Sequence, residues 1–210
     1  MRDCWYGDKR DLVKWASLVF LAGRHRVARI LQVAFYRPEV DSFRLEIGRA
    51  EADFPPEIIQ HFRKLERIEK LPLARTKIEV FKELFGNHPK SRPSQAARHH
   101  YFTRLISRVR SLRQARLIVF LDPDTGLAPR RKPSEKHVSP DEVRRVFEAL
   151  KPGDWLAFYQ HSHRKRTWRT VRRREFSRAA RVREARVRTC QCLDVAPDVA
   201  LFLVEKSGAQ

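Results

Sequence analysis

The sequence predicts a single α/β domain over residues 1–210, with a mostly parallel sheet that ends in an antiparallel hairpin. Short apolar segments rich in β-branched and aromatic residues alternate with segments of helical periodicity. The last two apolar segments are separated by Ala196-Pro197-Asp198, which is typical of a hairpin turn. With 210 residues, of which 42% are hydrophobic, the chain is long enough to bury one sizeable core.

The first elements are a helix and two strands. Residues 9–22 have a helical pattern, with Asp8 as the predicted N-cap and Gly23 at the predicted end. Residues 29–36 (RILQVAFY) are apolar and rich in strand-forming residues, and residues 43–47 alternate between apolar and polar. Both segments are therefore predicted to be strands.

Residues 55–113 are predicted to form a helical insertion. Pro55-Pro56 opens a helix whose apolar positions continue to Ile68, and a third helix runs to about Arg113. The short helix expected between them is defined by the apolar residues Ile78, Phe81, Leu84 and Phe85.

The second half continues the alternation of strand and helix. Ser139-Pro140-Asp141-Glu142 is a capping box that starts a helix through Leu150. The other predicted elements are a strand at 116–121, a loop at 127–138, a strand at 154–160, a basic helical segment at 164–188, and hairpin strands at 190–195 and 199–204.

Two strands end in polar residues. Asp122 and Asp124 follow the strand at 116–121, and Gln160 and His161 end the next strand. Ligands bind beyond the carboxyl ends of strands in such sheets, so these loops are expected side by side. Two acids there can bind a divalent metal, accept protons or orient an amine, or they can simply complete a turn. His161 is a candidate base or metal ligand and Gln160 a candidate donor to a substrate carbonyl.

The net charge of +20 indicates a polyanionic partner, with nucleic acid (RNA or DNA) first and an anionic membrane surface second. Residues 164–188 hold 12 Arg or Lys against two Glu, a density that suits phosphate contacts. The candidate nucleic-acid-binding residues are Arg164, Lys165, Arg166, Arg172, Arg173 and Arg174.

Several classes of protein and site do not fit. The longest apolar run, residues 15–22, is far shorter than a membrane span, and acidic residues precede it where a signal peptide would be basic. A cytoplasmic protein is therefore expected. Its three cysteines lack a Cys-x-x-Cys pair, and no glycine-rich phosphate loop, nucleophile elbow or dinucleotide fingerprint is present.

Two segments resemble known motifs. Gly7-Asp8-x-x-Asp11-Leu12-Val13-Lys14 is similar to the opening Gly-Asn-x-x-Asp-Val-Leu-Lys-His motif of the large-subunit ribosomal RNA adenine methyltransferase J family, and Asp122-Pro123 is similar to its Asp-Pro-Pro-Tyr motif. A closer resemblance is to an uncharacterised bacterial family with a Gly-Asp start, a Leu-Asp-Pro-Asp-Asn-Gly-Leu centre and a Tyr-Gln-His strand end. The corresponding residues here are Leu121–Leu127 and Tyr159–His161.

The resemblance implies a Rossmann-like, class I methyltransferase-type three-layer sandwich that uses S-adenosylmethionine. It implies that Gly7, Asp8, Asp11 and Lys14 contact the cofactor and that Asp122 accepts a hydrogen bond from the nitrogen to be methylated. The sequence departs from the ribosomal RNA family where Trp15 replaces its His and Asp124-Thr125 replaces its Pro-Tyr.

Three functions therefore remain open from the sequence. The leading one is a S-adenosylmethionine-dependent methyltransferase acting on nucleic acid. The second is a metal-dependent nuclease or phosphoester hydrolase, with Asp122, Asp124 and His161 holding Mg²⁺ or Mn²⁺. The third is a catalytically inert nucleic-acid-binding protein on a degenerate methyltransferase fold.

Overall fold

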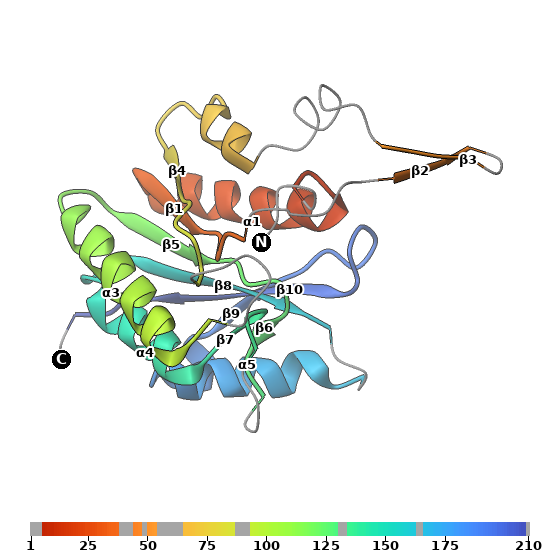
Figure 1. The fold of residues 1–210 in the computed structure, drawn as a ribbon. Helices are drawn as coiled ribbons and strands as arrows, with labels where there is room; N and C mark the ends of the chain where they lie inside the picture. The colour runs from red at the N-terminus through yellow and green to blue at the C-terminus, as the bar shows by residue number, and fades with distance from the viewer. Residues whose placement is uncertain are drawn as a thin grey trace.

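The fold is centred on a six-stranded, mostly parallel sheet (Figure 1). The computed structural model describes residues 6–37, 44–47, 50–53, 65–86, 93–129, 134–162 and 166–208. Across the sheet the strands are ordered β4 (Lys77–Phe81), β1 (Arg29–Val33), β5 (Leu117–Leu121), β8 (Trp155–His161), β10 (Val199–Glu205) and β9 (Arg188–Cys190). The first four are parallel, whereas β10 runs antiparallel to both of its neighbours.

Helices cover both faces of the sheet, which makes a three-layer α/β sandwich (Figure 1). One face carries α1 (Lys9–His25) and the 3₁₀ helix η2 (Leu65–Lys70). The other face carries α3 (Gln95–Ser111), α4 (Pro140–Ala149) and α5 (Trp168–Ala179), which the short 3₁₀ helix η3 (Glu184–Arg186) follows.

Alternating side chains of the strands supply two cores. Leu31 and Val119 belong to the core beneath α3, α4 and α5, whereas Ile30, Ile118 and Phe120 belong to the core beneath α1. Because both faces are covered, all five residues of β5 are buried. This explains why β5 is a continuous apolar run in the sequence.

Two small sheets lie outside the central one. The strands β2 (Arg44–Ile47) and β3 (Ala50–Asp53) form a hairpin, so the strand predicted at 43–47 is confirmed but pairs apart from the main sheet. The two-residue strands β6 (Gly126–Leu127) and β7 (His137–Val138) pair in parallel inside the segment predicted to be a loop.

Two predicted helix N-termini are confirmed, and one predicted helix C-terminus is wrong. Asp8 caps α1 by accepting from the backbone N–H groups of residues 10 and 11, and Ser139 forms the predicted capping box of α4. The first helix does not end at Gly23. It continues to His25, and the C-cap residue Arg26 takes the left-handed conformation (φ 51°).

The prediction of a wholly helical insertion at 55–113 is wrong. Residues 77–81 form β4, which pairs in parallel with β1 so that Ile78 lies opposite Ile30 and Phe81 opposite Val33. The apolar spacing resembled a helix, but the β-branched residues of this segment fit a sheet edge. Residues 54–64, which hold most of the helix expected after Pro55-Pro56, lie outside the described residues.

The predicted C-terminal hairpin is confirmed, with its first strand at Arg188–Cys190 instead of 190–195. Leu201 lies opposite Cys190 in this pair. No helix in the described part of the chain combines the length and hydrophobicity that crossing a bilayer requires.

Candidate functional site

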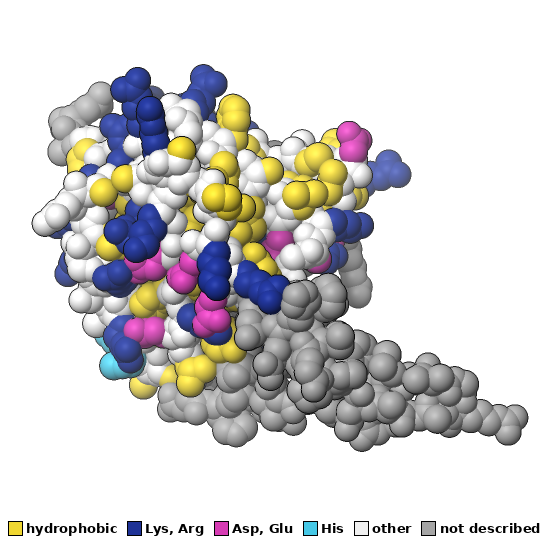
Figure 2. Space-filling view, turned by 90° about the horizontal axis from the view of Figure 1, so that it is seen from above, with side chains coloured by type: hydrophobic (Ala, Val, Ile, Leu, Met, Phe, Trp, Pro, Cys, Tyr) yellow, Lys and Arg dark blue, Asp and Glu magenta, His cyan; other side chains and the backbone are white. Residues whose placement is uncertain are grey.

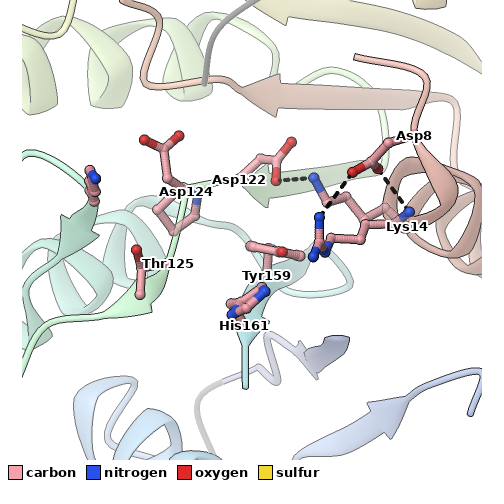
Figure 3. A pocket seen from close by; sticks show the side chains of 10 residues that line it. Asp8, Lys14, Asp122, Asp124, Thr125, Tyr159 and His161 are labelled. Atoms are coloured by element: carbon pink, nitrogen blue, oxygen red, sulfur yellow. Dashed lines mark hydrogen bonds and ion pairs between the residues drawn. The ribbon is translucent and has the colours of Figure 1, made fainter. Parts of the chain in front are cut away.

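A pocket of about 300 Å³ lies where the start of α1 meets the loops that follow β5 and β8 (Figure 3). The two loops lie side by side, because the backbone N–H of His161 donates to the carbonyl of Thr125 over 3.0 Å. The residues that line the pocket are Asp8, Arg10, Lys14, Asp122, Pro123, Asp124, Thr125, Lys136, Tyr159 and His161.

Lys14 is the central cation of this site. Its Nζ lies 2.9 Å from Asp11 Oδ1 and 2.9 Å from Asp122 Oδ1, and 4.3 Å from the centre of the Tyr159 ring (Figure 3). Burial alone would lower the pKa of Lys14, but the two carboxylates raise it well above its ordinary value. Lys14 therefore remains charged although its side chain is almost completely buried.

The N-terminal residues hold the helix that carries Lys14. Asp8 caps α1, and Asp11 Oδ2 accepts from the backbone N–H of Gly7 over 2.8 Å. Burial raises the pKa of Asp11, the negative charge of Asp122 raises it further, and Lys14 opposes both. The Gly-Asp-x-x-Asp segment thus encloses the buried lysine.

Asp122 lies at the base of the pocket. Its Oδ1 faces Lys14, and its Oδ2 accepts from Gln32 Nε2 over 2.9 Å. Gln32 is fully buried in β1, and the backbone N–H of Asp122 donates to Val33 in the same strand. Only 1% of the Asp122 side chain is exposed. The carboxylate therefore holds Lys14 in place and is enclosed by the protein.

Asp124 faces away from the Lys14 cluster. It forms an ion pair with Arg37, a buried residue shortly after β1, and Figure 3 shows its carboxylate beyond Asp122 as seen from Lys14. The second guanidinium nitrogen of Arg37 lies 3.8 Å from Glu135. This ion pair ties the loop after β1 to the loop after β5.

His161 belongs to a third group of charged residues. Its Nε2 lies 3.1 Å from Asp198 Oδ2, which also accepts from Arg10 Nη2 over 2.7 Å. Partial burial opposes ionisation of Asp198, but the hydrogen bonds and charge of Arg10 lower its pKa below the ordinary value. The group joins α1, the end of β8 and the start of β10.

These pairings separate the three residues expected to share a metal ion. Asp122 is neutralised by Lys14, Asp124 by Arg37, and His161 contacts Asp198. Among the residues that the structure describes, no three His, Cys, Asp or Glu side chains are grouped as a metal site requires. The geometry therefore gives no support to the hydrolase alternative.

Gln160 shapes the loop instead of facing a substrate. Its Oε1 accepts from the backbone N–H of Leu127, and its Nε2 donates to the carbonyls of Thr125 and His161. Gly126 has a positive φ of 122°, and a Cβ there would lie 2.4 Å from Gln160 Oε1. The loop after β5 is thus fixed by one buried amide and one glycine.

Three of the four candidate basic residues that the structure describes form ion pairs within the protein. Arg172 is buried and pairs with Glu175 at 2.7 Å, while Arg173 and Arg174 pair with Glu184. Arg166 is exposed, whereas Arg164 and Lys165 lie outside the described residues. In the described part of α5, the Arg-rich segment is therefore less available to phosphates than its sequence suggests.

Five residues of the site were not among the candidates predicted from the sequence. Gln32 and Arg37 stand in no motif, and Asp198 was assigned to a hairpin turn. Arg10 and Lys136 line the pocket from the first turn of α1 and from a basic loop, and neither pattern indicates a site residue. The available signal was positional for Gln32, Arg37 and Asp198, which lie at or near a strand end on the carboxyl edge.

Comparison with known proteins does not identify a family for this chain. No protein-family model matches the chain, and no curated protein sequence matches it. A DUF574 family protein from Streptomyces avermitilis, known from its crystal structure, is similar with a TM-score of 0.41 and 12% identity. That alignment covers 94% of this chain and 82% of the other. The α/β fold is established by the strand order described above.

Proposed function

We propose that this protein is a methyltransferase-like enzyme that uses S-adenosylmethionine and acts on nucleic acid, RNA or DNA. One observation carries the proposal. The start of α1 and the end of β5, which resemble two motifs of one methyltransferase class, meet in one pocket. Lys14 of the first segment lies 2.9 Å from Asp122 of the second.

The position of the pocket supports the proposal. It lies at the carboxyl edge of an open, mostly parallel sheet, where α/β enzymes bind their ligands. Its volume of about 300 Å³ is at the lower end of the range for small-molecule sites. It therefore suits one end of the cofactor rather than the whole molecule.

The charged side chains fit the amino-acid end of the cofactor, which carries one ammonium and one carboxylate. The lining contains the acids Asp8, Asp122 and Asp124 and the bases Arg10, Lys14 and Lys136. An ammonium has three N–H donors, and Lys14 donates one to Asp11 and forms an ion pair with Asp122, which leaves a donor for a ligand carboxylate. A balanced set of charges suits a zwitterion better than a simple anion.

The bound cofactor would supply an electrophilic methyl group. The protein's own contribution is to orient the cofactor and to exclude water. Lys14 and Arg10 would hold the carboxylate, Asp8 the ammonium, and the Tyr159 ring would form the apolar wall. Asp122 positions Lys14 in this scheme and is too deeply buried to accept from a substrate nitrogen directly.

Calorimetry with S-adenosylmethionine tests the proposal. The folded wild-type protein should bind it, and adenosine, which lacks the amino-acid end, should bind at least about tenfold more weakly because it forgoes a charge-assisted hydrogen bond. Lys136→Gln, an exposed change in the lining, should weaken binding, whereas Lys9→Gln outside the lining should not. Absence of binding to folded protein would refute the proposal.

A further inference from the structure

The two edges of the sheet differ sharply in charge. The carboxyl edge holds the pocket, where each acid described above lies beside a basic side chain. The amino edge, where β1, β5 and β8 begin, gathers basic residues from five separate segments. They are Arg24, Arg26, Arg116, Lys151, Arg186 and Arg188, and we call this set the amino-edge surface.

The topology places these residues together. Arg24 and Arg26 end α1 just before β1 starts, Arg116 directly precedes β5, and Lys151 lies in the turn before β8. The strand β9 is antiparallel to β10, which is antiparallel to β8, so β9 also starts at this edge.

Direct contacts join part of this set. Arg116 Nη1 donates to the carbonyl of His25 over 2.8 Å, and the His25 ring lies 4.6 Å from the ring of Trp155, the first residue of β8. The guanidinium of Arg188 lies 5.1 Å from the centre of the same Trp155 ring. The end of α1 and the starts of β5, β8 and β9 therefore meet around one buried tryptophan.

The charge of these residues is largely uncompensated. Four of the six side chains are exposed: Arg24, Arg26, Arg116 and Arg188. Among the described residues, the six form a single ion pair, between Lys151 and Asp154 at 3.6 Å. That aspartate is buried and accepts from two backbone N–H groups. In α5, by contrast, Glu175 and Glu184 engage three arginines.

The pKa of His25 reflects the positive electrostatic potential at this edge. Burial lowers the pKa of His25, and the positive charges of Arg188, Arg24 and Arg116 lower it further, against the opposing charge of Glu205. Three arginines from α1, β9 and the start of β5 thus act on one imidazole. Figure 2 shows Lys and Arg side chains on several parts of this face, among them its left side, on which β5 and β8 begin in Figure 1, with Asp and Glu side chains between them.

We infer that the amino-edge surface binds the phosphate backbone of a double-stranded nucleic acid, at the end of the sheet opposite the pocket. Five of the six side chains are arginines, whose planar guanidinium matches phosphate in a bidentate geometry. The surface runs from β1 to β9, and these five strands spaced about 4.8 Å apart give a length of about 19 Å, which corresponds to about six phosphates along one strand of a duplex. The inference rests on the proposed function only in taking the polyanion to be nucleic acid.

A pair of charge-matched variants tests this inference. Arg24→Gln/Arg188→Gln removes two charges from the surface, while Lys9→Gln/Arg67→Gln removes two exposed charges from elsewhere. The probe is a labelled RNA or DNA duplex of about 20 base pairs, titrated by fluorescence anisotropy without cofactor over a range of salt. The loss of two phosphate contacts should weaken binding about thirtyfold at 0.15 M salt and reduce the salt slope by about 1.8.

The control variant should retain wild-type binding within about threefold, since only non-specific attraction changes. Equal losses in the two variants, or no duplex binding by the wild-type protein, would overturn the inference. So would binding to phosphatidylserine vesicles that depends on Arg24 and Arg188 in a protein that ignores duplexes. Because no cofactor is present, failure of the methyltransferase proposal leaves this result unaffected.

Discussion

The buried ion pairs of Lys14 give a quantitative test of the site. In Lys14→Met, the aliphatic volume is retained but the carboxylates of Asp11 and Asp122 face each other without the ammonium that lies 2.9 Å from each. Their side chains are 4% and 1% exposed, so water solvates these carboxylates poorly in place of the ammonium. One of the two must take up a proton for the variant to fold.

The cost of that proton sets the expected loss. Protonating an aspartate of ordinary pKa costs about 4 kcal/mol at pH 7 and about 1.5 kcal/mol at pH 5. The value at pH 7 agrees with the roughly 3–5 kcal/mol typical of breaking a buried ion pair from one side. Because the folded variant binds a proton that the unfolded chain releases, its stability falls as pH rises through this range.

Urea unfolding followed by tryptophan fluorescence measures both effects. Lys14→Met should lose about 4 kcal/mol of unfolding free energy at pH 7, and the loss should shrink by more than half at pH 5. Lys9→Met, at an exposed lysine of the same helix, should change stability by less than about 0.5 kcal/mol at either pH. Adding Asp122→Asn to Lys14→Met should remove most of the pH dependence. A loss below about 1 kcal/mol, or one equal at both pH values, would refute the buried triad.

Three further predictions test other parts of the structure. Gly126→Ala should lower the free energy of unfolding by about 2–3 kcal/mol, because its Cβ would lie 2.4 Å from Gln160 at a φ of 122°. Gly23→Ala, in open space within a helix, should raise it by about 1 kcal/mol. Thermal unfolding measures both, and two changes of equal sign would contradict this. Ser139→Ala should cost about 1 kcal/mol by breaking the capping box of α4, and an unchanged melting temperature would argue against the cap. Asp198→Asn should lose stability at pH 7, and its difference from the wild-type protein should shrink as the pH falls below the ordinary aspartate pKa, because a carboxylate of lowered pKa stabilises the fold only while it is ionised. A difference that does not shrink in acid would exclude this cause.

The parts of the fold that follow from local patterns were predictable. Asp8 and Ser139 are helix caps because their side chains reach N–H groups within the same turn, which spacing alone reveals. The strand β5 was equally clear because both of its faces are buried. The segment at 77–81 was misassigned because its apolar spacing fits helix and strand alike, and only pairing with β1 decides between them.

The location of the site residues in the fold was predictable, but their side-chain contacts were not. The rule for strand ends placed Asp122 and His161 at one edge, and the structure has both in the pocket lining. What each carboxylate contacts depends on side chains from distant segments, such as Gln32 for Asp122. The net charge of +20 likewise did not show which face of the protein is basic. That depends on which arginines form ion pairs with glutamates in the folded chain.

The two edges together impose a length on the ligand. The pocket and the amino-edge surface lie at opposite ends of strands such as β8, whose seven residues span about 23 Å. A nucleic acid held at both ends must therefore cover at least about seven nucleotides at 3.4 Å each. Duplexes shorter than this should compete for the amino-edge surface without protecting the pocket, whereas longer ones should do both. Chemical modification of Lys136, the exposed lysine of the pocket lining, reads out that protection. Protection of Lys136 by the shortest duplexes would place the nucleic acid at the pocket alone.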